Sequence, residues 1–451
     1  AATDVADTFR IGAGVTDVAD VDGNNAGGTT FDTLEGSLGN DTITLTGTDA
    51  GSFGITTFQD LQSIDGRDGA DTFNIDSSGR LTRTLSGGLG DDTLTGPASG
   101  SEFTVSAANA GDIAIGGLDV LDTSGSAGTG FNTIENIAGG AGQDTVTVDA
   151  AGSLAGGINT GAEDDTISIS STVGGVVNAG AGNDTVTLTG ADVTGGGVTT
   201  GTGDDEVTFN GAVSGNVSAT NGENTFTLAA GASLNGLITG GTGQDVLVST
   251  DAAIFSVTDL NTGLLLGTST SFGGVDSLTG SASADEFRFD GGRLAGGIDG
   301  NGGADTLLGS DSAVVGEEDQ LTLTGTDEGT FVGGDTVAGA AGGIDVTGIQ
   351  NIDLRDGADS VTLTDGTVLS GTLSGGTGDD TLTGNASGAA FAVTAANAGT
   401  VDTDPVTGAD IDFSSVENLT GGVGDDTFDV DADLSGDLDG GAGTEDTLNL
   451  A

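Results

Sequence analysis

The chain has 451 residues and a formal net charge of −62, with 69 acidic side chains against seven arginines and no Lys, His, Cys, Tyr, Trp or Met. This charge excludes the basic surface that nucleic acids and anionic membranes require, and no apolar run is long enough for a membrane span. Most general bases and activated nucleophiles are also missing, so no enzyme is predicted. A pair of carboxylates could hydrolyse glycosides in principle, but among 69 acids any such pair is unspecific.

A glycine-rich motif recurs along the chain with the pattern G-G-x-G-x-D-x-U-x, where U is apolar. Clean copies begin at Gly87, Gly139, Gly375 and Gly421. Aligned on the motif Asp, the positions from 144 to 245 are separated by 21, 19, 21, 19 and 21 residues. One structural unit of about 20 residues therefore accompanies each motif. This regularity argues against a disordered acidic chain.

Each motif is flanked by apolar residues at fixed distances. Downstream, stretches such as Thr145–Val148 alternate polar and apolar residues, as a strand does. Upstream, an apolar residue such as Ile158 or Val177 lies seven positions before the Asp. Two short strands cannot bury an apolar face alone, so the units must stack. The predicted fold is an all-β parallel β-solenoid of about 20 residues per turn, with two short strands and a glycine-rich corner in each turn.

A longer repeat overlies the motif. The segment at 98–111 returns at 386–399, and the segment at 44–53 returns at 322–331. The chain is therefore divided into residues 1–165, with insert-bearing turns, 166–278, with regular turns, and 279–451, which repeats the first part. The inserts, near 93–143, 246–284, 306–358 and 381–425, are expected to form longer loops or short extra strands. Both ends of the sequence look like cuts in, or processing of, a longer chain.

The motif resembles the haemolysin-type repeats of RTX proteins, which bind Ca²⁺ between stacked turns of a β-roll. The residue types suit a hard cation, because Ca²⁺ prefers carboxylate and backbone carbonyl oxygens. The resemblance implies that each ion is shared by two successive loops. The predicted metal ligands are Asp41, Asp71, Asp92, Asp144, Asp165, Asp184, Asp205, Asp245, Asp285, Asp305, Asp359, Asp380, Asp426 and Asp446.

The sequence departs from the family in two ways. One motif per unit, rather than two, predicts a single edge of stacked carboxylates. Several copies are also altered: Glu163 replaces a glycine, Asn224 replaces the Asp, and residues 354–356 replace the first positions of another copy. The alternative is that these loops are tight corners in which Asp and Asn only cap backbone amides. Growth at high salt is another possible source of the acidity.

The repeats and the RTX resemblance predict a secreted, calcium-binding structural protein. It would form part of an extracellular filament, surface layer, biofilm matrix or adhesin stalk, with self-association into a polymer and cell-surface glycans as further partners. An accessory or spacer domain of a larger toxin, adhesin or polysaccharide-modifying enzyme is the alternative. A third possibility is a carbohydrate- or mineral-binding surface made of the threonines at 145, 147, 185 and 187.

Overall fold

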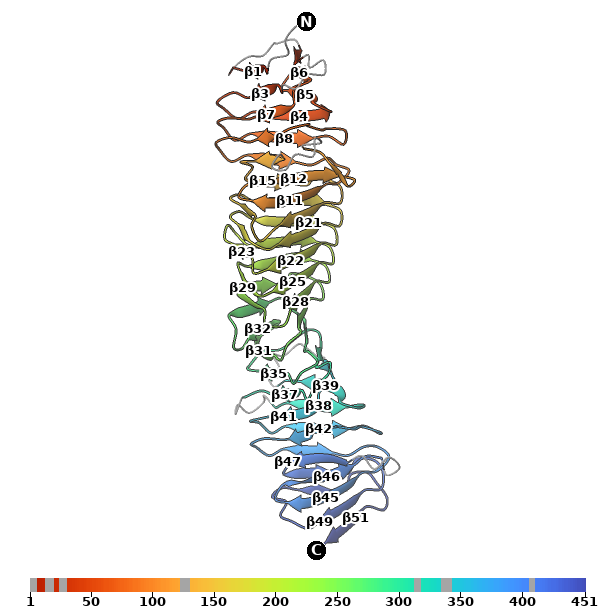
Figure 1. Cartoon of the computed structure of the whole chain (residues 1–451). Helices are drawn as coiled ribbons and strands as arrows, with labels where there is room; N and C mark the ends of the chain where they lie inside the picture. Colours follow the sequence, from red (N-terminus) through yellow and green to blue (C-terminus); the bar gives the residue numbers. More distant parts are fainter. Residues whose placement is uncertain are drawn as a thin grey trace. The chain divides into compact units, whose positions relative to one another are not determined.

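The computed structural model describes residues 6–12, 20–23, 31–121, 130–311, 318–333, 343–404 and 410–451. In these ranges all regular secondary structure is β-strand, and no helix suited to crossing a bilayer occurs. The chain divides into two compact units, Ala1–Phe226 with Ala232–Gly243, and Thr227–Gly231 with Gln244–Ala451. Figure 1 shows the strands of each unit stacked as successive turns. The predicted parallel β-solenoid is confirmed.

In the first unit, strands alternate between two sheets, A and B. The register follows the motif spacing, since Thr145 pairs with Thr166 and Thr166 with Thr185. Sheet A contains β1 (Thr8–Arg10), β3 (Thr33–Glu35), β7 (Ser63–Asp65), β9 (Leu85–Ser86), β11 (Glu102–Ala107), β12 (Ala110–Ile115), β13 (Leu118–Asp119), β14 (Phe131–Asn132), β16 (Thr145–Val148), β19 (Thr166–Ile169), β22 (Thr185–Thr189) and β25 (Glu206–Asn210). Sheet B contains β2 (Val21–Asp22), β4 (Thr42–Gly47), β5 (Ala50–Phe53), β6 (Thr56–Gln59), β8 (Thr72–Ile75), β10 (Thr93–Thr95), β15 (Asn136–Ala138), β18 (Ile158–Ala162), β21 (Val177–Ala181), β24 (Val198–Thr202), β27 (Val217–Asn221) and β29 (Ser233–Thr239).

The regular turns contain a third strand, which the two-strand prediction missed. It precedes the sheet B strand and forms a third parallel sheet. Sequence patterns did not separate it from the next strand, because only Ala155, Gly156 and Gly157 lie between the buried Leu154 and the buried Ile158. The third sheet contains β17 (Ser153–Leu154), β20 (Thr172–Val173), β23 (Asp192–Val193) and β26 (Ala212–Ser214). Strand β28 (Thr225–Leu228) lies at the division between the units.

The second unit also alternates between two sheets, again called A and B. Sheet A contains β30 (Val246–Ser249), β34 (Ser277–Thr279), β36 (Ile298–Asp299), β38 (Gln320–Leu323), β39 (Glu328–Val332), β40 (Ile344–Thr347), β42 (Ser360–Leu363), β44 (Thr381–Thr383), β48 (Asn418–Thr420) and β50 (Leu438–Asp439). Sheet B contains β31 (Ile254–Asp259), β32 (Thr262–Leu265), β33 (Thr270–Gly273), β35 (Glu286–Phe289), β37 (Thr306–Leu308), β41 (Asn351–Asp353), β43 (Thr372–Ser374), β45 (Ala390–Ala395), β46 (Ala398–Asp402), β47 (Asp410–Ser414), β49 (Thr427–Val430) and β51 (Thr447–Leu450).

Within the described residues, the predicted inserts form antiparallel hairpins that widen one sheet; residues 122–129, 312–317, 334–342 and 405–409 of these inserts lie outside the described part of the chain. The hairpins are β11–β12, β31–β32, β38–β39 and β45–β46, and a fifth hairpin, β4–β5, lies outside the predicted inserts. Each tip places an Asp or Asn at positive φ, which these two residue types tolerate best after glycine. The tip residues are Asp49, Asn109, Asn261, Asp327 and Asn397.

The core is a narrow column of alternate strand residues. Val146, Ile167 and Val186 are fully buried on successive turns of the first unit. In the second unit, stacked aromatic pairs fill the column, with ring centroids 5.2 Å apart for Phe255 and Phe287. Strand pairing and this apolar column together hold successive turns in place.

Candidate functional site: two sets of carboxylate ladders

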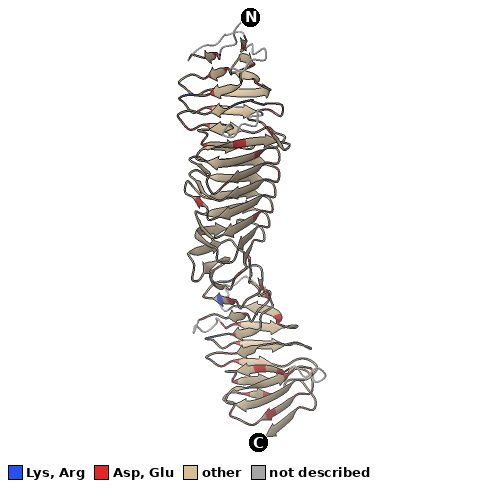
Figure 2. Cartoon of the chain, viewed as in Figure 1, with Lys and Arg blue, Asp and Glu red and all other residues tan. Residues whose placement is uncertain are grey.

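The motif aspartates lie at two kinds of corner, so the predicted single edge is wrong. In the first unit, Asp71 and Asp92 end loops that lead from sheet A to sheet B, whereas Asp144 and Asp165 directly precede strands of sheet A. Two half-turns separate Asp71 from Asp92, but three separate Asp92 from Asp144, because the hairpin insert lies between them. Figure 2 shows acidic residues on the loops along both sides of each unit, with few arginines among them.

At each corner the motif carboxylates form a ladder of hydrogen bonds. The backbone N–H of one ladder residue donates to the side chain of the ladder residue one turn later. Asp144 N donates to Asp165 Oδ1 at 2.7 Å, and Asp165 N donates to Asp184 Oδ1 at 2.8 Å. Asp184 continues to Asp205, and Asp205 to the side-chain oxygen of Asn224. Capping of backbone amides, the predicted alternative role of the motif Asp, is therefore present.

The remaining predicted aspartates lie in shorter ladders. The first unit has a second ladder through Asp41, Asp71 and Asp92. In the second unit the ladder bonds join Asp245 to Asp276, Asp285 to Asp305, Asp319 to Asp359, Asp359 to Asp380, and Asp426 to Asp446. Asp319 and Asp276 were not among the predicted ligands, because inserts displace them from the motif spacing.

Most ladder carboxylates are buried and have one oxygen without a hydrogen-bond donor. Asp144 and Asp305 are completely buried, and Asp165 and Asp184 are 1% exposed. Within the described part of the chain, no partner is found for the Oδ2 atoms of Asp71, Asp92, Asp144, Asp165, Asp184, Asp205, Asp305, Asp359, Asp380 and Asp426. A buried carboxylate oxygen in this setting requires a proton or a cation.

Asp41, Asp285 and Asp446, three other predicted ligands, differ from this pattern. Asp41 and Asp285 each accept a backbone N–H from a serine in their own loop at Oδ2, from Ser37 at 2.6 Å and from Ser281 at 2.7 Å. Asp446 is exposed. These three carboxylates therefore need a bound cation less than the buried ones do.

Glycine at the first motif position makes room for the carboxylate. A methyl group at Gly66 would lie 2.3 Å from Asp71 Oδ2 and 2.5 Å from the carbonyl oxygen of Gly87, one turn later. The corresponding distances at Gly139 are 2.3 Å to Asp144 Oδ2 and 2.7 Å to the carbonyl oxygen of Thr160. The unpartnered carboxylate oxygen and a carbonyl of the next turn thus approach the same glycine, and both carry negative charge.

The regular turns differ at that position. Thr160, Ala179 and Thr200 stand where the clean copies have glycine, and their side chains fill the space beside the carboxylate. We call the loops of Asp71, Asp92, Asp144, Asp305, Asp380 and Asp426 the glycine-led loops, because Gly66, Gly87, Gly139, Gly300, Gly375 and Gly421 begin them.

Burial raises the pKa values of several ladder carboxylates. It raises the pKa of Asp144, Asp184 and Asp380 to about 6, and that of Asp71 and Asp359 to about 7. Ladder hydrogen bonds oppose this shift, and neighbouring carboxylates add to it. These carboxylates therefore take up and release protons close to neutral pH.

The residues fit a hard cation that is coordinated chiefly by the backbone. In the described ranges, no three acidic side chains gather into one metal-binding group. Because Oδ1 of each motif Asp is engaged by the ladder, a Ca²⁺ ion would receive Oδ2 and complete its six to eight oxygens from loop carbonyls and water. Assignment of the fourteen aspartates as calcium ligands stays a prediction.

The ladder ends use side chains that the motif search missed. Asp92 N donates to Glu135 Oε2 at 2.9 Å, while the tip residue of the adjacent hairpin, Asn109, donates to Glu135 Oε1 at 2.8 Å. Glu417 receives the same two bonds from Asp380 N and Asn397. The sequence carried a signal, since Ile134–Asn136 resembles Val416–Asn418 at an offset of 282 residues.

Beside the buried ladder of the regular turns, an exposed ladder of side chains runs in the opposite direction. In the regular turns, the residue before the motif Asp accepts a backbone N–H from the next turn. Asn183 N donates to Asp164 Oδ1 at 2.7 Å, and Asp204 N donates to Asn183 Oδ1 at 2.9 Å. Each regular corner is thus tied to both neighbouring turns by side chains.

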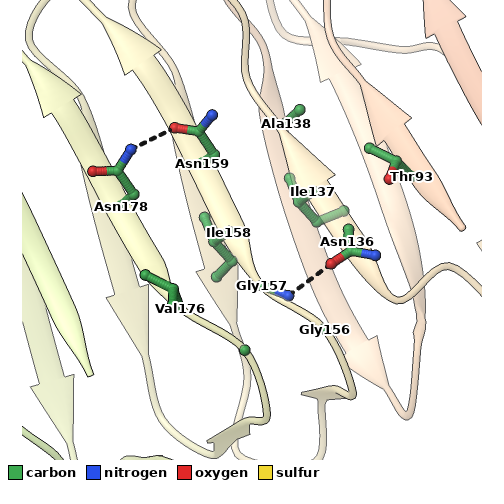
Figure 3. Close-up of a pocket in the computed structure, with 11 residues that line it drawn as sticks. Thr93, Asn136, Ile137, Ala138, Gly156, Gly157, Ile158, Asn159, Val176 and Asn178 are labelled. Atoms are coloured by element: carbon green, nitrogen blue, oxygen red, sulfur yellow. Dashed lines mark hydrogen bonds between the residues drawn. The ribbon is translucent and has the colours of Figure 1, made fainter. Parts of the chain in front are cut away.

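A groove of about 520 Å³ lies on sheet B of the first unit, lined by uncharged residues (Figure 3). Asn178 Nδ2 donates to Asn159 Oδ1 at 2.9 Å, and Gly157 N donates to Asn136 Oδ1 at 2.9 Å. No ladder carboxylate lines it. The predicted threonine surface lies on sheet A, where Thr147 and Thr187 are half-buried and Thr185 is exposed; its binding of glycans or minerals stays a prediction.

Comparisons with known proteins add little to this geometry. No family model and no curated protein matches the chain, so the RTX resemblance stays a prediction. Among solved structures, the chain is similar to a hyperactive, Ca²⁺-dependent, β-helical antifreeze protein from an Antarctic bacterium. The identity is 16% over 94% of this chain and 84% of the other, with a TM-score of 0.19. At that TM-score the likeness carries no argument about the site or the activity of this chain.

Proposed function

We propose that the chain is a calcium-binding structural repeat protein, whose corner loops are tied together by Ca²⁺. The observation that carries the proposal is the row of buried motif carboxylates, ten of which have one oxygen that lacks a donor within the described residues. In the glycine-led loops this oxygen and a carbonyl of the next turn face the same glycine. A divalent ion bound there would neutralise the carboxylate and join two successive turns.

We further propose that the protein works outside the cell, as part of a filament, surface layer, biofilm matrix or adhesin stalk. The net charge of −62 supports this role, because a chain of that charge repels itself and is compacted by divalent cations. The repeats also extend along nearly the whole sequence, which suits a mechanical element. The proposal assigns no catalysis to the chain, and self-association and glycan contacts remain part of it.

The test of the proposal is a calcium titration of the purified chain. After dialysis against a chelator at neutral pH, we expect weak strand-type circular dichroism, which returns as Ca²⁺ is added. Mg²⁺ at the same concentration serves as the control, since it binds dedicated all-protein oxygen cages poorly. A spectrum and a bound-metal count that do not respond to calcium would contradict the proposal. Electron microscopy of the calcium-loaded sample then distinguishes a filament from a monomeric spacer.

A further inference from the structure

We infer that Arg67 and Arg355 are built-in cations, each taking the place of a calcium ion between two stacked loops. The inference rests on the proposed function, since it concerns which loop pairs need calcium. Arg67 lies in the first unit, between the loop at 36–41 and the loop at 66–71. Arg355 lies in the second unit, in the loop at 354–359, and contacts residues 309 and 311 of the turn before.

Both arginines occupy a motif position that normally belongs to glycine. They stand four residues before the ladder residues Asp71 and Asp359, where clean copies have residues such as Gly88. Arg67 has φ 77° and Arg355 has φ 71°, a conformation that only glycine adopts without strain. An arginine that tolerates this backbone strain twice, at equivalent positions, is expected to have a purpose there.

The two backbones are held in the same way. The N–H of Arg67 donates to Asp65 Oδ1 at 3.1 Å, and the N–H of Arg355 donates to Asp353 Oδ1 at 3.1 Å. Both carboxylates end the strand that leads into the loop. The equivalence therefore extends from the sequence to the local fold.

Each guanidinium reaches back to the loop one turn earlier. Arg67 Nη1 lies 3.5 Å from the carbonyl oxygen of Gly36, and Arg355 Nη1 donates to that of Gly309 at 3.2 Å. Gly36 and Gly309 each follow directly on a strand, β3 and β37, and begin the earlier loop. The same atom of both arginines thus contacts the equivalent carbonyl.

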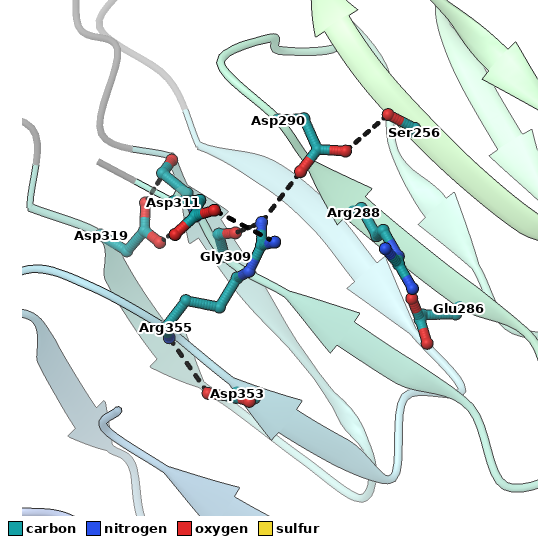
Figure 4. A network of polar contacts seen from close by, with 10 residues as sticks. Ser256, Glu286, Arg288, Asp290, Gly309, Asp311, Asp319, Asp353 and Arg355 are labelled. Carbon is teal, nitrogen blue, oxygen red and sulfur yellow. Dashed lines mark hydrogen bonds and ion pairs between the residues drawn. The ribbon is translucent and has the colours of Figure 1, made fainter. Parts of the chain in front are cut away.

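Carboxylates of neighbouring turns complete the oxygen environment. Glu35 Oε2 lies 3.6 Å from Arg67 Nε and also pairs with Arg10. Arg355 lies 2.9 Å from Asp290 Oδ1 and 3.6 Å from Asp311 Oδ2 (Figure 4). Carbonyl and carboxylate oxygens are the kind of ligand that Ca²⁺ binds, and here a guanidinium contacts them.

Substitution by glycine tests the inference, because it restores the motif and removes the cation. In Arg67→Gly and Arg355→Gly, the ions bound per chain are counted by equilibrium dialysis and elemental analysis. We expect about one further Ca²⁺ per substitution and about two in the double variant, as each vacated oxygen set accepts one ion. Arg80→Gly and Arg288→Gly are the matched controls, because Arg80 donates to carbonyls of its own loop and Arg288 pairs with Glu286, outside both oxygen sets.

Thermal melting in chelator gives a second readout. The loop variants should melt at a lower temperature than wild type in chelator and regain the difference in Ca²⁺, whereas the controls should respond equally in both buffers. A folded double variant that binds the same number of ions as wild type would overturn the inference. A wild-type chain that binds no calcium would instead overturn the proposed function.

Discussion

The inner rungs of the ladders and their ends place carboxylates in two different settings. Asp184 accepts a donor only at Oδ1, from the N–H of Asp165, and its buried Oδ2 has no donor among the described residues. Glu135, at the end of another ladder, has a donor at each oxygen, from a ladder N–H and from a hairpin asparagine. The free oxygen of an inner carboxylate therefore needs a proton or a cation. At Glu135 the amide of the hairpin residue Asn109 satisfies the second oxygen instead.

Removal of metal should have the largest effect, because it should destabilise the inner carboxylates but not the ladder ends. At neutral pH, chelation leaves the inner carboxylates charged and buried, so we expect loss of most strand-type circular dichroism. Each site stabilises the fold by about 2.7 kcal/mol when calcium is at about 100 times its Kd, and several sites act together. Thermal melts with and without chelator measure the effect, and coinciding melting curves would contradict it.

The pH dependence of the calcium-free chain should follow from the raised pKa values. A folded-state pKa of about 6 for Asp144 and about 7 for Asp71 exceeds the value of the unfolded chain, 3.8. The folded state then binds these protons more tightly than the unfolded state does. Their contribution to the free energy of unfolding is complete at low pH and is lost as the pH rises toward 7. We expect melting temperatures in chelator to fall between about pH 4 and 7. Calcium should remove most of this decline, and a rise in chelator would refute the assignment.

Neutralising one inner carboxylate should separate its role as a hydrogen-bond acceptor from its role as a metal ligand. Asp380→Asn keeps an oxygen for the N–H of Asp359, a bond of 2.8 Å, but removes the charge. In chelator at neutral pH, the variant should gain on the order of 1 to 3 kcal/mol, because a pKa shift of one unit is worth about 1.4 kcal/mol. It should also bind less calcium. Asn224, which holds the same ladder position naturally, shows that an amide fits there.

Asp184→Asn is the matched control for Asp380→Asn. Ala179 fills the space beside Asp184, whereas Gly375 leaves it open beside Asp380. Both substitutions should stabilise the chelated chain, but the loss of bound calcium should be larger for Asp380→Asn. Equal losses would show that calcium does not bind preferentially in glycine-led loops.

Disrupting a ladder end should cost stability without involving metal. Glu135→Ala leaves the N–H of Asp92 and the amide of Asn109 without their acceptor. We expect a loss of about 1 to 3 kcal/mol, the usual cost of an unsatisfied buried group. The loss should be the same in calcium and in chelator, as determined by parallel denaturant titrations. A loss confined to calcium buffer would place Glu135 among the metal ligands.

The regular part of the fold was predictable because periodicity reports burial. The spacing near 20 residues gave the turn, and apolar residues such as Val146 and Ile158 are buried as expected. The third strand was missed because two glycines hide a corner between Leu154 and Ile158. The number of carboxylate edges was also missed, since a motif fixes spacing along the chain but not the phase shift that a hairpin introduces. The pairing of Glu135 with Asn109 depends on contacts between distant turns, which no local pattern reports.

The most direct test is a calcium-soaked crystal structure of the chain, with anomalous scattering used to locate the ions. The account predicts ions beside Oδ2 of the glycine-led aspartates, such as Asp144 and Asp380, and none beside Glu135 or Glu417. Ladder carboxylates that keep their hydrogen bonds and show no ion in saturating calcium would contradict it.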